Sequence, residues 1–453
     1  MKKRTKILSI IFIILAVYII LVITPYFKLP QTNVSDLDNL SDINLVLSNL
    51  SDTQVGRAAL ISDGKEALDV RISLINMAEK RIDLGTFIFS DDESGKLVAG
   101  ALLSAAERGV QVNIVADNIS ARIKLMKSGI GLALGLHENI KIKIFNRWSI
   151  IFPWRLNSCF HEKYMSVDNR VYLIGGRNIE NRFYESDDSE SLTETDLEVM
   201  IWTEDPSIQN HINDVWNNSK VLTECFENTI FFLKDRYEKK QRKLIDFYDS
   251  NKNIYGNYTE EMLLNKTVVI NGLGVISNPQ TLTSNEPVVW NKMLSLFLLR
   301  KEDTVFITPY ISINTQMKKD LSLISNNMNL TLVNNSHASG INYVAMSDEL
   351  IHSDMYKKIG ARYVEPNRDK AYHTKAVIVG DEISIIGSFN LDIRSAFIDS
   401  ELMLVIKGEE FNKLLKNYYD NLNTDVSPVE MKLGKRIILY LLSPLASLFR
   451  FLI

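Results

Sequence analysis

The chain has 453 residues, of which 46% are hydrophobic and 23% are charged, and its formal net charge at pH 7 is −4. This length and apolar content suffice for two domain cores or one large duplicated core. The slightly acidic balance gives no sign of a nucleic-acid partner, and two cysteines, Cys159 and Cys225, are too few for a disulfide framework.

The N-terminal segment is basic and is followed by an apolar run. Four basic residues lie within residues 2–6, and residues 7–23 are apolar apart from Ser9. A helix of about 20 residues is roughly 30 Å long, enough to cross the hydrocarbon core of a bilayer. The basic start favours a cytoplasmic N-terminus, with the rest of the chain across the membrane. We therefore expect residues 1–27 to be an uncleaved anchor; the alternative is a cleaved signal peptide, although no small-x-small site follows the run.

Residues 28–55 are expected to be a tether. Their polar part is rich in Asn, Asp and Ser, with apolar residues at helical spacing that suit one weak helix. Such a segment would carry the folded body off the bilayer.

The next stretch alternates helical and extended patterns. Residues 65–79 and 96–108 have helical periodicity, and residues 81–89, 110–117 and 141–145 read as strands. Strand, helix, strand is a βαβ unit and implies a parallel sheet. A long helical stretch follows after residue 205, and its charged run at 234–243 is a solvated face or a contact with anionic lipid.

The same order returns in the second half of the chain. A polar, turn-rich stretch at 253–260 marks the seam, and a helix at 290–299 is followed by strands at 304–310 and 329–333. We expect an α/β protein with two similar halves, residues 56–255 and 256–425.

One pattern of about twenty residues occurs once in each half. Residues 159–178 and 372–390 align without a gap, so that equivalent polar or turn positions coincide. These pairs are His161 and His373, Lys163 and Lys375, Gly175 and Gly387, and Asn178 and Asn390. Each copy predicts a hairpin with His and Lys on one face of its first strand. A lone copy would suit an ordinary hairpin with a satisfied histidine.

Two copies related by a pseudo-twofold axis would bring two His, two Lys and two Asn around one pocket. The cations and amides suit the non-bridging oxygens of a phosphodiester. One imidazole can attack phosphorus while the other protonates the departing alcohol. The lysines supply the positive charge that a metal would otherwise provide, and the sequence has no Cys/His cluster with metal-ligand spacing, so no metal or other cofactor is expected.

The duplicated pattern resembles the phospholipase D superfamily, whose signature is His-x-Lys-x4-Asp with a downstream Gly-x-x-Asn. Asp168 completes the signature in the first copy, and residues 175–179 and 387–395 are similar to the bacterial cardiolipin synthase branch. The resemblance covers most of the chain after about residue 55. It implies two phospholipase D-like α/β/α sandwich halves that share one active site.

The second copy departs from the signature at one position. Gly380 stands where Asp168 stands in the first copy, and the acid follows one place later at Asp381. In the family this aspartate supports the motif and does not react. The departure therefore bears on local support and not on His373 or Lys375.

Two further acids occupy equivalent places after the motifs. Asp196 and Glu401 begin strands of like pattern at 196–201 and 401–406. A reacting imidazole needs an acceptor at its far nitrogen, and in the resembling family an acid at this place is that acceptor. Exposed acids at strand ends are the alternative.

The resemblance implies a two-step phosphatidyl transfer. His161 would attack phosphorus and form a phosphohistidine while His373 protonates the leaving alcohol, and an incoming hydroxyl would then take the phosphatidyl group. The expected phosphate ligands are Lys163, Lys375, Asn178, Asn390 and, through one hydrogen bond, Ser388. The glycerol headgroup of phosphatidylglycerol as acceptor would give cardiolipin, and water would give hydrolysis. A nuclease of the same superfamily would use the same residues, and a catalytically silent membrane scaffold would use none of them.

Two further segments bear on the membrane. Residues 147–155 carry Trp148 and Trp154 and are either a core loop or a site mouth that meets acyl chains. Residues 426–453 end in an apolar run with a basic edge, and an interfacial position is favoured over packing on the body or a true span. We expect a protein of the bacterial inner membrane with its body on the extracytoplasmic side. Its partners would be phosphatidylglycerol, a second phospholipid and, in some settings, a small accessory subunit, with no nucleic acid.

Overall fold

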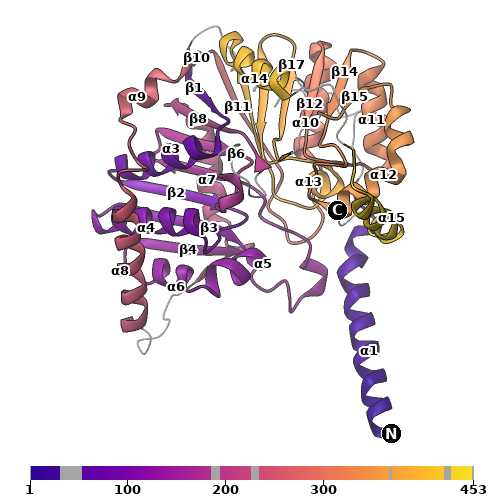
Figure 1. The fold of residues 1–453 in the computed structure, drawn as a ribbon, viewed down its shortest axis with the longest axis horizontal. Coiled ribbons are helices and arrows are strands. Elements are labelled where there is room, and N and C mark those ends of the chain that lie inside the picture. Colours follow the sequence, from indigo (N-terminus) through magenta and orange to yellow (C-terminus); the bar gives the residue numbers. More distant parts are fainter. Residues whose placement is uncertain are drawn as a thin grey trace.

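The computed structural model describes residues 2–30, 54–184, 194–225, 234–366, 370–422 and 430–450 of the chain. Two mixed sheets lie next to each other, the purple and magenta half and the orange and yellow half of Figure 1. The expected α/β fold with two similar halves is confirmed. Most of the tether expected at residues 28–55 lies outside the described residues.

The sheet of the first half has nine strands among the described residues, in the order β10-β1-β8-β6-β5-β2-β3-β4-β9. The strands are β1 (Gly56–Ile61), β2 (Arg81–Thr86), β3 (Gln111–Asp117), β4 (Ile140–Phe145), β5 (Tyr164–Val167), β6 (Val171–Gly175), β8 (Glu198–Thr203), β9 (Leu222–Cys225) and β10 (Val268–Ile270). The strands β2, β3 and β4 are parallel, as the βαβ pattern predicts. The hairpin of β5 and β6 is the first copy of the motif.

Helices cover the outer face of this sheet. They are α3 (Gly64–Met77), α4 (Glu93–Glu107), α6 (Ile130–Gly135) and α8 (Lys234–Asn251), and they bury their apolar faces in one core with β2, β3 and β4. The carboxylate of Asp92 accepts a 3.0 Å hydrogen bond from the Gly95 amide, so α4 begins three residues before the expected start at 96.

The second half repeats the arrangement with seven strands, in the order β11-β20-β18-β17-β12-β14-β15. They are β11 (Gly272–Ser277), β12 (Thr304–Ile307), β14 (Leu330–Val333), β15 (Arg362–Val364), β17 (Ala376–Val379), β18 (Ile383–Gly387) and β20 (Leu402–Lys407). The outer helices are α10 (Val288–Arg300), α11 (Thr315–Ser325) and α12 (Tyr343–Lys357). Because β10 pairs with β1, the chain changes sheets at Asn271, beyond the seam expected near 255.

A shared core lies between the two sheets. It joins apolar residues of both halves with α7 (Ser207–Asn217) and α14 (Glu409–Leu422), one helix from each half. The sheets are therefore fixed to each other by a continuous apolar layer, which holds the two motif copies in place.

Shorter elements join these layers. They are α5 (Asn118–Ser120), η3 (Ala121–Met126), η4 (Pro153–Arg155), η5 (Asn181–Phe183), β7 (Glu194–Thr195), α9 (Glu260–Asn265), β13 (Ile311–Ser312), β16 (Ala371–Tyr372), β19 (Leu391–Asp392) and α13 (Ile393–Phe397).

The N-terminal helix α1 (Lys2–Ile23) projects from the body (Figure 1), and η1 (Thr24–Tyr26) follows it. Among the described residues, the segment Lys6–Tyr26 is the one helical stretch long and apolar enough to cross a membrane. Tyr26 is buried in the core of the second half. The end of α1 is therefore docked on the body, whereas the tether was expected to hold the body away.

The C-terminal helix α15 (Leu433–Leu448) has two different faces. Leu439, Ser443 and Ala446 are buried, and Ala446 packs against Ala345 of α12. The opposite face exposes a row of large apolar side chains: Leu433, Ile437, Ile438, Tyr440, Leu441, Leu445 and Leu448. The helix thus packs on the body and still presents an apolar surface outward.

Candidate active site

Short backbone pairings across the two halves bring the motif copies together. The strand β7 pairs in parallel with β16, and the amide of His373 donates a 2.7 Å hydrogen bond to the Thr195 carbonyl. In the same way Phe160 forms a bridge with Ser400, and the amide of His161 donates to the Ser400 carbonyl at 3.0 Å. Each histidine therefore enters the site on backbone held by the opposite half.

The two acids are exchanged between the halves. The Nδ1 atom of His161 lies 2.8 Å from Oε1 of Glu401, and the Nδ1 atom of His373 lies 2.7 Å from Oδ2 of Asp196. Both carboxylates are fully buried. In a neutral imidazole whose Nδ1–H donates to the carboxylate, the lone pair of Nε2 stays available for chemistry.

Neither acid begins its long strand. β8 starts at Glu198 and β20 at Leu402, because the residues just before them pair with the opposite half. The expected strand starts at 196 and 401 are therefore wrong by two residues and by one. Each acid lies between a residue that pairs with the opposite half and the long strand that pairs within its own half.

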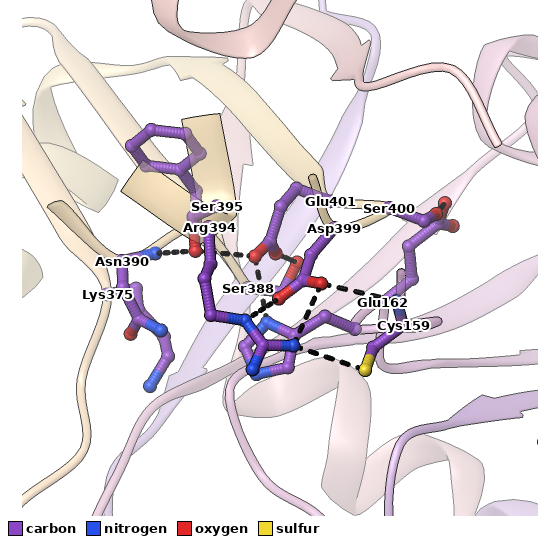
Figure 2. A network of polar contacts seen from close by, with 12 residues as sticks. Cys159, Glu162, Lys375, Ser388, Asn390, Arg394, Ser395, Asp399, Ser400 and Glu401 are labelled. Atoms are coloured by element: carbon purple, nitrogen blue, oxygen red, sulfur yellow. Dashed lines mark hydrogen bonds and ion pairs between the residues drawn. The ribbon is translucent and has the colours of Figure 1, made fainter. Parts of the chain in front are cut away.

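Two serine side chains donate hydrogen bonds to the carboxylate of Glu401. The hydroxyl of Ser388 donates to Oε2, and that of Ser395 donates to Oε1 at 2.7 Å; Figure 2 shows both reaching the carboxylate. The hydroxyl of Ser388 is thus bonded to Glu401, and Ser388 is not among the residues that line the cavity described below. In the first half Gly176 takes the place of Ser388, and a Cβ there would lie 2.5 Å from the Asp196 carboxylate oxygens. The shorter Asp196 needs that glycine, whereas the longer Glu401 accommodates a serine.

The lysines of both motifs reach back to their histidines. Lys163 donates to the His161 carbonyl, and Lys375 donates to the His373 carbonyl and lies 2.8 Å from Nδ1 of His373. Both ammonium groups are buried. With Asp196 and Glu401 they form a cluster whose formal charges cancel before any ligand binds.

Each asparagine of the motif forms a hydrogen bond within its own half. Asn178 accepts a 3.2 Å hydrogen bond from the Ile88 amide, and Asn390 donates one of 3.2 Å to the Tyr310 hydroxyl. The side-chain oxygen of Asn390 is buried and has no hydrogen-bond partner among the described residues.

A cavity of about 350 Å³ lies between the halves, within the usual range for small-ligand sites. Both histidines and Asn178 line it, while Lys163, Lys375 and Asn390 are not among its lining residues. The remaining lining residues are Phe87, Ile88, Arg182, Glu194, Pro309, Tyr310, Asn335, Gly340, Ile341, Asn342, Met346 and Tyr372. The rings of Phe87 and Phe183 pack on His161 and His373, with ring centres 5.3 and 5.1 Å apart.

Burial dominates the protonation of the site. It lowers the pKa of His161 and that of His373 well below the usual value, and Lys163 and Lys375 act in the same direction. Burial also lowers the pKa of Lys163 to about 7, and the charge of Glu401 is the strongest opposing effect. It lowers the pKa of Lys375 to about 8, and there the strongest opposing effect is the charge of Asp196. Burial raises the pKa of Glu401 to about 7 against the effect of Lys163. An empty site thus holds neutral imidazoles, and a bound anion would favour protonation.

The structure does not bring Asp168 or Asp381 into the site. Asp168 follows the far end of β5, with φ = 52°, and its carboxylate accepts hydrogen bonds from the amides of Glu79, Lys80 and Arg81 at 2.9, 2.8 and 2.8 Å. Asp381 is exposed and pairs with Lys416. Asp168 therefore supports the turn before β2, and Asp381 does not take over that role.

The second half fills the equivalent space in another way. Gly380 has φ = 55°, and a Cβ built on it would lie 1.7 Å from Oε2 of Glu302. The Glu302 side chain thus occupies the place of an acid at 380, and the absence of an aspartate leaves His373 and Lys375 untouched.

Sequence reasoning missed several residues of the site. Asp117 accepts a 3.0 Å hydrogen bond from the Phe160 amide, and Asn335 exchanges bonds of 2.8 and 2.7 Å with the amide and carbonyl of Tyr372. Each thus holds the residue before a motif histidine. The available signal was a polar residue at the carboxyl end of a parallel strand in each half. Arg182 and Glu194 line the cavity without any repeated pattern that could have marked them.

A family model described as "Cardiolipin synthase, PLD-like domain" matches residues 72–219 and 299–423, more than half of the chain. The chain belongs to the phospholipase D-like family. The two matched segments carry the two motif copies, one in each half, as the resemblance predicted.

Relatives within this family share modest identity over most of their length. Cardiolipin synthase C of Escherichia coli (strain K12) is 23% identical over 77% of this chain and 81% of its own. An uncharacterized protein of Helicobacter pylori (strain ATCC 700392 / 26695) is 27% identical over 79% and 78%. The crystal structure of phosphatidylserine synthase from Haemophilus influenzae Rd KW20 has a TM-score of 0.62 at 16% identity, covering 90% of this chain and 99% of that one, and shares the fold.

Proposed function

We propose that the protein is a membrane-bound phosphatidyltransferase that makes cardiolipin from phosphatidylglycerol and a second phospholipid. The observation that carries this proposal is the pair of histidines facing one cavity, each bonded through Nδ1 to a buried acid of the opposite half. The similarity to cardiolipin synthase C of Escherichia coli supports the choice of substrate class.

In the first step the Nε2 lone pair of His161 attacks phosphorus, and the bond from phosphorus to the headgroup oxygen breaks. His373 donates a proton to that oxygen, so the headgroup leaves as a neutral alcohol. The product is a phosphatidyl group bound to His161. Glu401 accepts from Nδ1 of His161 and stabilises the positive charge that forms on the ring.

In the second step the hydroxyl of the incoming lipid loses its proton to His373 and attacks phosphorus. The phosphorus–nitrogen bond breaks, which restores neutral His161 and protonated His373. His373 is neutral in the empty site, so the bound phosphodiester anion must raise the pKa of His373 before the first step. The buried charges of Lys163 and Lys375 attract the same anion.

We further propose that the body rests against the bilayer. The hydroxyl of Tyr18 donates a 2.9 Å hydrogen bond to the Ile150 carbonyl, which attaches the loop of residues 147–155 to α1. If α1 spans the membrane, Tyr18 lies about 7 Å inside the level of Ile23. In this loop Trp148, Ile150, Ile151 and Trp154 are exposed, which argues against a core loop.

The apolar face of α15 supports the same orientation. Lys435 at its start donates to the carbonyls of Ala338 and Gly340, and Gly340 lines the cavity. At its end Arg450 bonds to Asp348 at 2.8 Å. We propose residues 1–27 as the anchor and 426–453 as the interfacial segment, with the N-terminus cytoplasmic and the body extracytoplasmic.

The test is the lipid profile of cells that lack their other cardiolipin-forming enzymes. Cells expressing the chain should accumulate cardiolipin, and those expressing His161→Ala should not. Asp381→Ala is the matched control, because it removes an exposed acid outside the site and should keep cardiolipin. Phosphatidic acid in place of cardiolipin would assign hydrolysis. Identical lipids with the intact chain and with His161→Ala would contradict any lipid chemistry at this site.

A further inference from the structure

The cavity wall contains a buried carboxylate that the proposed mechanism does not use. Glu194 lines the cavity together with Arg182 and His373 and is only 6% exposed. Its Oε2 atom is buried and has no hydrogen-bond partner in the part of the chain that the structure describes. A buried acceptor without a partner is rare in a folded protein and marks a place where a ligand can bond.

The position of Glu194 relates it to the reacting atoms. It lies on β7, where it pairs with Ala371, two residues before His373. Glu194 therefore lies beside the strand that leads into His373, the histidine that would receive the proton of the acceptor hydroxyl, and both residues line the cavity.

The chemistry of Glu194 limits what it can bind. A carboxylate accepts hydrogen bonds, so its ligand must bring a donor, and a phosphodiester anion has none. The ligand group must therefore belong to the headgroup beyond the phosphate. A hydroxyl and an ammonium both qualify by this criterion.

Arg182 decides between these two groups. Its Nη1 atom lies 3.6 Å from Oε1 of Glu194, so a guanidinium already neutralises the carboxylate from that side. Lys375 acts on Glu194 in the same sense as Arg182, and the acids Asp196 and Glu180 act in the opposite sense. An incoming ammonium at this carboxylate would meet the guanidinium of Arg182, which lies 3.6 Å from Oε1, whereas a neutral hydroxyl would not be repelled by it.

We propose that Glu194 is a specificity-determining residue that accepts a hydrogen bond from a second hydroxyl of a neutral polyol headgroup, such as glycerol. This inference rests on the proposed function and adds to it the residue that selects the acceptor. Holding one hydroxyl of the polyol directs its neighbour toward His373 and phosphorus.

The test compares two acceptors that attack the same intermediate. The full-length chain in detergent micelles receives phosphatidylglycerol as donor, with deuterated glycerol and ethanol as competing acceptors. Deuterated phosphatidylglycerol and phosphatidylethanol are counted by mass spectrometry. Because both acceptors share the first step, the ratio of the two products reports only on acceptor recognition.

In Glu194→Gln the ratio of glycerol product to ethanol product should fall about 10- to 100-fold, the loss expected for one hydrogen bond to a charged acceptor. Phosphatidylethanol should still form, which shows that the variant is folded. The matched control is Glu180→Gln, which removes the other carboxylate bonded to Arg182, at 2.9 Å, and which does not line the cavity. This control should keep the wild-type ratio.

Three results would overturn the inference in different ways. An unchanged ratio in Glu194→Gln, with phosphatidylethanol still formed, would remove Glu194 from acceptor selection and leave the proposed function intact. With ethanolamine added as a third acceptor, a loss in Glu194→Gln confined to the ethanolamine product would show that Glu194 binds an ammonium. Wild-type protein that forms neither product would overturn the proposed function, and this inference with it.

Discussion

Asp168 closes the turn before β2, and replacing it tests whether the signature aspartate is structural. Asp168→Gly copies into the first half the residue that the second half has at Gly380, and glycine tolerates the positive φ of 52°. The matched control is Asp381→Gly, the same change at an acid whose side chain is 92% exposed.

The expected loss follows from the three amides that Asp168 accepts from, at 2.8 to 2.9 Å. They are exposed or half-buried, so each bond contributes about 1 kcal/mol. The variant should lose roughly 2–3 kcal/mol, whereas Asp381→Gly removes a surface ion pair and should lose under about 1 kcal/mol. For a half of about 200 residues this corresponds to an apparent Tm lower by roughly 5–10 °C.

The assay is near-UV circular dichroism of the full chain in detergent micelles at a fixed scan rate, with transferase kcat and KM measured well below the transition. We expect a lower Tm with nearly unchanged kcat. A Tm within 1 °C of that of Asp381→Gly would refute the role in the turn. A normal Tm with kcat reduced by several orders of magnitude would instead place Asp168 in the chemistry.

Three further predictions concern the site and the membrane. Glu401→Gln should lower kcat by roughly 10²–10⁴-fold with little change in KM, because His161 loses its charged partner. Steady-state kinetics measure both constants, and a decrease of kcat by less than about threefold would contradict this prediction. Lysines carry charge below their pKa, so kcat/KM, which reports on the free enzyme, should fall as pH rises through about 7 to 8; a profile flat to pH 9.5 would contradict charged Lys163 and Lys375 as the anion-attracting groups. Ile151→Asp should lower kcat/KM on phosphatidylglycerol vesicles about tenfold and leave a water-soluble short-chain substrate unaffected. Leu323→Asp, at an exposed leucine of α11, is its control, and equal losses in the two variants would refute membrane contact by the 147–155 loop.

The duplicated pattern was enough to predict a shared site, because its hairpins follow local rules of strand periodicity and turn chemistry. His161 and His373 could be paired by self-comparison alone. The exchange of acids could not, since it depends on how two sheets pack about an axis. The sequence around Asp196 contains no pattern that predicts its contact with the histidine of the other half.

The acid at 381 shows the limit of the motif itself. The spacing suggested that Asp381 takes the place of the signature aspartate. In the structure the side chain of Glu302, a residue about eighty positions earlier in the chain, fills the space that a side chain at position 380 would occupy. Glu194 could not be found for a related reason: its significance lies in an oxygen without a partner, and only packed side chains reveal such an atom. The two faces of α15 could likewise not be distinguished from the sequence, because the buried face is defined by its packing on α12.

The phosphohistidine mechanism is tested most simply by looking for the phosphatidyl group on a histidine. The full-length chain is incubated with phosphatidylglycerol labelled at phosphorus, quenched in base, and digested for mass spectrometry. We expect an acid-labile, base-stable label on the peptide that carries His161, lost in His161→Ala and still formed, with slower turnover, in His373→Ala. A label on His373, or none on either histidine during active transfer, would contradict the mechanism.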